Sequence, residues 1–162
     1  MSASERFHNT VLEFLDTISS CVEDLAYKGM TKLTTFQLTA AKAYLEKFPS
    51  AKLLLSFVDN HSTWKSIEKR DVKFITEQVP ILYKDTGMDV AILTCPFECY
   101  ARYGAKSPVT AEDISIIWEY FETMVRVACN FVFNERRRTQ GYMSSIDLDH
   151  YTRSFHFELI LD

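Results

Sequence analysis

The chain has 162 residues, of which 47% are hydrophobic and 25% are charged, a balance typical of one globular domain that buries its own core. The net charge of −4 argues against general polyanion binding, although it leaves room for a local basic face. The polar N-terminus, the lack of an apolar run of about 20 residues and the four scattered cysteines predict an intracellular protein with no membrane span and with reduced thiols.

Glycine and proline divide the sequence into segments that have the period of a helix. Apolar residues recur at three- and four-residue spacing from about residue 4 to 27, and Gly29 then suits a left-handed helix cap. Thr34 and Gln37 match a capping box, which predicts that a second helix begins there. Ser50 is predicted to cap a short third helix.

The middle of the chain is less regular. Apolar stretches around Trp64 and Phe74 predict one or two helices with a break near Asp71. Residues 88–93 are apolar enough to be buried, and their pattern fits a short helix as well as a strand. Pro96 suits the first position of a further short helix.

The strongest helical pattern follows Pro108. Thr110 and Asp113 form a second capping-box-like pair, and Gly141 marks the expected exit from this helix. One face carries the apolar residues Ile114, Ile117, Trp118, Phe121, Val125, Ala128, Phe131 and Val132. The sequence therefore predicts a mainly α single-domain helical bundle of about six to eight helices, with this long late helix as its spine.

The end of the chain has a different pattern. Residues 1–143 are expected to form the helical domain, and residues 144–162 an extended C-terminal tail with the two-residue period of a strand. A lone strand needs a partner for its backbone groups, so the tail is expected to dock on its own domain, on a second copy or on another protein. The candidate interaction residues are the alternating Phe155, Phe157, Leu159 and Leu161.

Three consecutive arginines, Arg136, Arg137 and Arg138, end the long helix. Arginine at this position complements the negative end of the helix dipole and can simply remain solvated. The alternative is contact with a nucleic-acid backbone or with an acidic partner. These three residues are therefore also candidate interaction residues, with nucleic acid as the alternative partner.

No catalytic or metal-binding motif of good specificity is present. Cys95 and Cys99 lie one helical turn apart, but their spacing differs from that of common zinc and redox motifs, so buried thiols are the expected reading. The four histidines are scattered along the sequence. We therefore expect no metal, no cofactor and no enzymatic activity. An enzyme with a cysteine- or histidine-based site ranks below the two functional hypotheses given at the end of this section.

Four short motifs occur in a fixed order along the chain: FL at 14–15, YLEKFP at 44–49, WKSIEKRD at 64–71 and IWEY at 117–120. In this pattern the chain resembles a group of short helical proteins of large nucleocytoplasmic DNA viruses. The motifs are structural, and the group suggests no activity and no catalytic residue. The resemblance implies a viral protein in the cytoplasm or nucleus of the host cell, or in the virion.

The preferred hypothesis is a non-enzymatic interaction or structural protein that acts through its helical surface and its tail. Its expected partners are other proteins, including further copies of itself. A nucleic-acid-binding accessory protein is the alternative.

Overall fold

The computed structural model describes residues 1–139 and 145–162, which form helices and connecting turns with no β-strand among them. The mainly α fold with a long late helix is confirmed. The α-helices are α1 (Ala3–Tyr27), α2 (Thr35–Lys47), α3 (Ser50–Asp59), α4 (Trp64–Glu68), α5 (Val79–Leu82), α6 (Ala91–Tyr103), α7 (Ala111–Arg138) and α8 (Leu148–Ser154).

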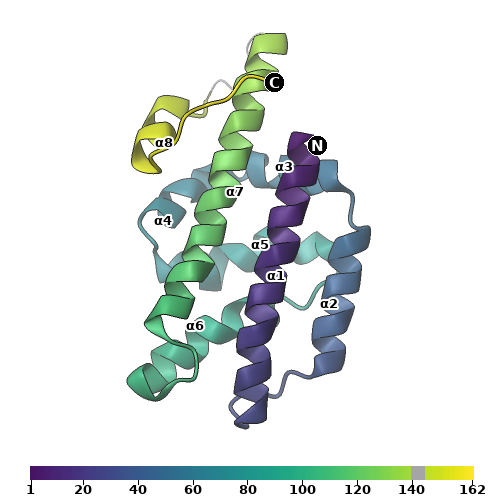
Figure 1. Ribbon diagram of the computed structural model, residues 1–162, viewed down its shortest axis with the longest axis vertical. Helices are drawn as coiled ribbons and strands as arrows, with labels where there is room; N and C mark the ends of the chain where they lie inside the picture. Colours follow the sequence, from purple (N-terminus) through teal and green to yellow (C-terminus); the bar gives the residue numbers. More distant parts are fainter. Residues whose placement is uncertain (140–144) are drawn as a thin grey trace.

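Helices α1 and α7 form the centre of the fold. They lie side by side and run in opposite directions, and α2 flanks α1 (Figure 1). Helices α3 to α6 cross behind this pair, while α8 lies on the outer side of α7 near its C-terminal end (Figure 1). The two long amphipathic helices thus bury their apolar faces against each other and against the shorter helices.

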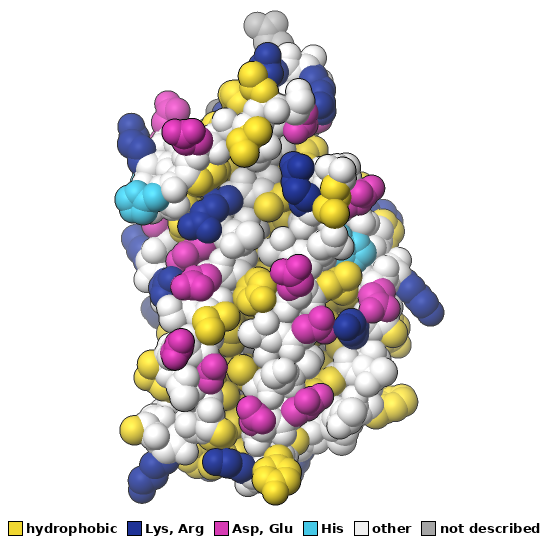
Figure 2. Space-filling view, viewed as in Figure 1, with side chains coloured by type: hydrophobic (Ala, Val, Ile, Leu, Met, Phe, Trp, Pro, Cys, Tyr) yellow, Lys and Arg dark blue, Asp and Glu magenta, His cyan; other side chains and the backbone are white. Residues whose placement is uncertain are grey.

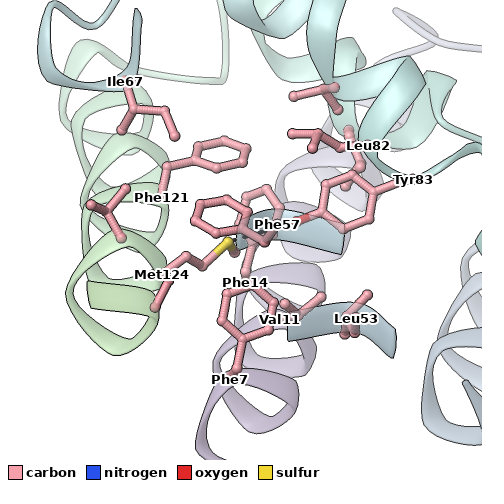
Figure 3. Packing of buried hydrophobic residues seen from close by; sticks show 14 of the residues in the cluster. Phe7, Val11, Phe14, Leu53, Phe57, Ile67, Leu82, Tyr83, Phe121 and Met124 are labelled. Atoms are coloured by element: carbon pink, nitrogen blue, oxygen red, sulfur yellow. Dashed lines mark hydrogen bonds between the residues drawn. The ribbon is translucent and has the colours of Figure 1, made fainter. Parts of the chain in front are cut away.

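Aromatic rings fill the space between α1 and α7. Phe14 and Phe121 meet edge to face with their ring centroids 4.9 Å apart, and Phe121 meets Phe74 in the same way at 5.0 Å. Figure 3 shows Phe121 and Met124 of α7 pointing into the same interior as Phe14 and Phe57. Edge-to-face contacts of this kind stabilise a core beyond the burial of area.

Both tryptophans are core residues, as their positions in the helical pattern predict. Trp64 is fully buried and stacks on Phe57, and Trp118 is 3% exposed and packs on Phe97. The predicted apolar face of α7 is buried, except that Ile114 and Phe131 are only partly covered.

The predicted helix ends are mostly confirmed. Both capping boxes form, the first between Thr34 and Gln37 and the second at the start of α7. Gly29 has a φ of +69°, a conformation that glycine adopts without strain. The prediction for Ser50 is wrong: it is the first residue of α3, and its hydroxyl lies 2.6 Å from Nδ1 of the buried His8.

The prediction for Pro96 is also wrong. It lies inside α6, which begins five residues earlier at Ala91, so the second half of the ambiguous segment 88–93 is part of a helix. The Asp89 carboxylate accepts the Ala91 N–H and starts the helix there. Burial of the apolar side chains around Pro96 compensates for the missing backbone hydrogen bond.

The predicted break near residue 71 is confirmed. Arg70 has a φ of +50° between α4 and a single π-helical turn at Phe74–Gln78. The Val79 N–H donates to the carbonyl of Phe74, five residues back. Pro80 has no N–H and cannot donate the backbone hydrogen bond that a regular α-helix would need at this position. The π-helical turn therefore comes immediately before α5.

The C-terminal region differs from the prediction in two respects. Residues 148–154 form helix α8 instead of extended chain, because Asp147 accepts the His150 N–H as an N-cap and Leu148 and Tyr151 face the core. Phe155 and His156 then form a turn, in which His156 has a φ of +54°, and residues 157–162 continue without a helix and without a β-ladder to any described residue. The predicted helix exit at Gly141 and the boundary between residues 143 and 144 lie outside the described residues.

Candidate functional site

The C-terminal segment, residues 145–162, is anchored first by α8. The side chains of Leu148, Tyr151 and Phe155 are buried against α7 and α4. The Tyr151 ring meets Trp64 edge to face at 5.4 Å between centroids and stacks on Phe155 at 6.2 Å. These rings extend the aromatic core outward, so the segment is packed on its own chain.

A polar cluster fixes α8 to α4. The Ser154 hydroxyl donates to Oε1 of Glu68 at 2.5 Å, and His150 Nε2 lies 2.9 Å from Oε2 of the same carboxylate. These two interactions, the Ser154 bond first, hold the pKa of Glu68 below its ordinary value. Ser154 Oγ also lies 3.5 Å from His150 Nε2, so the two side chains of α8 meet at a single carboxylate of α4.

The tail, residues 155–162, is held by two asparagine side chains of α7. The Ile160 N–H donates to Oδ1 of Asn130 at 2.6 Å, and Nδ2 of Asn134 donates to the Ile160 carbonyl at 2.9 Å. The Asp162 N–H donates to Oδ1 of Asn134 at 3.1 Å. The two amide side chains therefore act as a strand partner for the extended backbone.

The spacing of residues along α7 and along the tail explains these three hydrogen bonds, which we call the asparagine ladder. Residues four apart on a helix are separated by about 6 Å along its axis, and residues two apart on an extended chain by about 6.6 Å. Asn130 and Asn134 therefore match the backbone groups of Ile160 and Asp162 in step. A helix whose own carbonyls are already used can bind an extended segment only through side chains of this kind.

The tail side chains alternate between the core and the solvent, with one exception. Phe155 is buried, and Phe157 and Leu159 pack partly buried against the core. Ile160 is 69% exposed, but Leu161, whose alternation predicts an inward position, is 55% exposed as well. Two large apolar side chains therefore remain at the surface.

The structure separates the three candidate arginines. Arg136 donates to the Ile146 carbonyl at 2.8 Å, and Arg138 forms ion pairs with Glu135 and with Asp162 of the tail. Arg137 is exposed beside a groove of about 620 Å³ between α7 and residues 145–149. Two of the three arginines thus bind the C-terminal segment of their own chain.

A second groove, of about 490 Å³, lies on the side of the tail that faces α1. Its walls are apolar side chains of α7 and of the tail, with Arg6 of α1 and Arg126 of α7 among them. Figure 2 shows hydrophobic side chains at the surface where the tail crosses α7, with charged side chains of both signs around them. The Arg126 guanidinium also donates to the Phe155 carbonyl at 3.2 Å.

The four cysteines are free thiols, and Cys21, Cys95 and Cys99 meet in one small apolar cluster. Cys95 lies against Thr31 and Cys99 against Ser107, and burial raises the pKa of the Cys129 thiol to about 12. Within residues 1–139 and 145–162, no group of three or more His, Cys, Asp or Glu side chains is arranged to hold a metal ion.

No protein-family model, curated protein or solved structure matches this chain. None of the helices in the described part of the chain is long and apolar enough to cross a membrane.

Sequence reasoning missed the residues that hold the tail. Asn130, Asn134 and Arg126 share one side of α7, and their four-residue spacing on the polar side of a long helix was the available signal. Glu68 carried no comparable signal, since it is 86 residues from Ser154 in the sequence.

Proposed function

We propose that the protein is a non-enzymatic interaction protein, and that the surface around its docked tail binds another protein or a second copy of this chain. The observation that carries the proposal is the exposure of Ile160 and Leu161 on a backbone held by the asparagine ladder. Apolar side chains presented in a fixed position lose little conformational entropy on binding.

The polar cluster supports a non-enzymatic role. Ser154, His150 and Glu68 are the described residues that most resemble a nucleophile with its base and acid. Their hydrogen bonds instead join two helices, with Ser154 donating to the carboxylate. This arrangement stabilises the position of α8 and leaves no activated nucleophile.

The biological setting is part of the same proposal. On its resemblance to helical proteins of large DNA viruses, we propose a viral protein that acts inside the host cell or as a structural part of the virion. Nucleic-acid binding is the second candidate, and the exposed position of Arg137 is the observation that favours it.

Photocrosslinking and sedimentation velocity test the proposal together. A photoreactive residue at position 161 is compared with one at position 81, since Leu161 and Ile81 are 55% and 58% exposed. We expect a discrete adduct, to a partner in the native cells or to a second copy of the purified chain, from position 161 alone. A monomeric protein with identical adducts from both positions would contradict the proposal.

A further inference from the structure

We infer that the groove between α1, α7 and the tail binds an extended peptide of a partner protein that carries one carboxylate side chain between apolar residues. This inference rests on the proposed function and names the chemistry of its partner. The apolar walls of the groove come from Val127, Phe157, Ile160 and Leu161.

Two arginines supply the charge that selects a carboxylate. Arg6 and Arg126 both line the groove, and neither forms an ion pair within the described residues. Arg6 belongs to α1 and Arg126 to α7, so two guanidinium groups reach one groove from two different helices. Each donates one hydrogen bond to a backbone carbonyl, Arg6 to Met1 and Arg126 to Phe155, which leaves most of its five N–H donors for a ligand.

The acidic residues of the groove limit the partner to a single carboxylate. Asp162 is already paired with Arg138 at 3.2 Å. Glu158 is exposed, lines the groove and has no ion pair among the described residues, so it repels a run of acidic side chains. A lone carboxylate flanked by apolar residues satisfies the arginines and avoids this repulsion.

The tail also offers backbone groups to an extended peptide. Successive residues of an extended chain direct their N–H and C=O groups to opposite edges. Ile160 and Asp162 use their groups on the asparagines of α7, whereas those of Leu161 have no hydrogen-bond partner in the described part of the chain. A peptide that adds along this edge gains main-chain hydrogen bonds.

The shape of the site favours a peptide over a compact ligand. Sites for small molecules enclose most of the ligand surface. Here Ile160 and Leu161 are more than half exposed, so the groove is an open trough that suits a chain continuing beyond both ends.

Selection of displayed random peptides on the full-length protein tests this inference. Enriched peptides are expected to carry one Glu or Asp between apolar residues. Fluorescence anisotropy then measures the best peptide against the wild type, Arg6→Gln, Arg126→Gln and the control Arg137→Gln, which lies outside the groove. We expect about tenfold weaker binding for the first two variants and no change for the control.

A double-mutant cycle separates the carboxylate contact from loosening of the tail. Replacing the peptide carboxylate with an amide is expected to weaken binding to the wild type but to have little further effect on Arg6→Gln. Amide exchange at Ile160 verifies that the tail stays docked in each variant.

Three outcomes overturn the inference. Enriched peptides that depend on Leu161 but ignore both arginines overturn it and leave the proposed function intact. Saturation of the groove by a medium-chain fatty acid in place of any peptide overturns it as well. Peptide binding that survives both Leu161→Asp and Ile160→Asp removes the tail surface from the proposed function too.

Discussion

The α1–α7 core and the C-terminal segment hold their backbones in place by different chemistry. Helices α1 and α7 satisfy their own backbone groups and associate by burying aromatic rings such as Phe14 and Phe121. The tail has no regular structure of its own and borrows hydrogen bonds from Asn130 and Asn134. We therefore expect the core to fold without the tail, and the tail to become ordered only on the finished surface of α7.

The largest effect is expected in the core. Phe121→Ala and Trp118→Ala should each lower the free energy of unfolding by about 3–5 kcal/mol, because each leaves a cavity among packed rings. Chemical denaturation measures this, with Ile81→Ala as a control at a 58% exposed position. Near-native stability of both core variants would show that the buried face of α7 is not the centre of stability.

Removal of the tail should have a smaller effect. A chain that ends at Ser154 loses the burial of Phe155, worth about 1.5–3 kcal/mol, and the asparagine ladder. We expect a lower melting temperature with the helical circular dichroism largely kept. Unchanged stability together with lost self-association would mean that the tail docks in trans in solution.

Variants of the single asparagines should show which hydrogen bond of the tail each side chain supports. Asn134→Ala removes the bonds to the Ile160 carbonyl and the Asp162 N–H, at about 1 kcal/mol each. Hydrogen exchange should become faster at Asp162 in this variant, and faster at Ile160 in Asn130→Ala. Asn9→Ala, an exposed change on α1, serves as the control. Equal protection of both amides in all variants would exclude the ladder in solution.

Acid should loosen α8 before the core. The pKa of Glu68 is lowered in the folded protein, chiefly by the Ser154 hydroxyl, so its contribution to stability is complete above the ordinary carboxyl pKa. That contribution is lost as the pH falls through the folded-state value. Amide exchange in α8 should therefore rise below that range in the wild type, and Glu68→Gln should be loosened at neutral pH. An α8 with identical exchange in both proteins would contradict this prediction.

The smallest effect is expected for Arg137→Ala, which should change neither stability nor tail docking. Arg136→Ala and Arg138→Ala should loosen the C-terminal segment, since both side chains bind it.

The nucleic-acid alternative predicts instead that each arginine contributes about 0.9 to the logarithmic salt dependence of DNA affinity. Titration of duplex DNA at several salt concentrations distinguishes the two, and an equal contribution from all three arginines would favour the alternative.

The helical core was predictable because its signals are local. Capping residues such as Thr34 and Thr110 and the apolar period of α7 act within a few residues of each other. The start of α6 was missed because burial of its side chains overcame the tendency of Pro96 to stand at a helix start.

The candidate site was predictable only in part. The two-residue period matches the inward positions of Phe157 and Leu159, whereas His156 lies in a turn and Leu161 is exposed. The tail's hydrogen-bond partners are side chains 26 to 30 residues away on α7, and no local pattern identifies such pairs. The helical conformation of α8 was missed because it depends on the Asp147 cap and on burial of Tyr151.

The contact between Trp64 and Tyr151 gives the protein a built-in optical signal. The Trp64 indole is fully buried, and its N–H has no hydrogen-bond partner among the described residues, so its fluorescence should lie at the short-wavelength end of the usual range. Departure of α8 removes the Tyr151 ring and admits water, which shifts the emission to longer wavelength. In a Trp118→Phe background, Trp64 is the sole tryptophan of the sequence. Its emission then follows the docking of the C-terminal segment in real time without any attached dye.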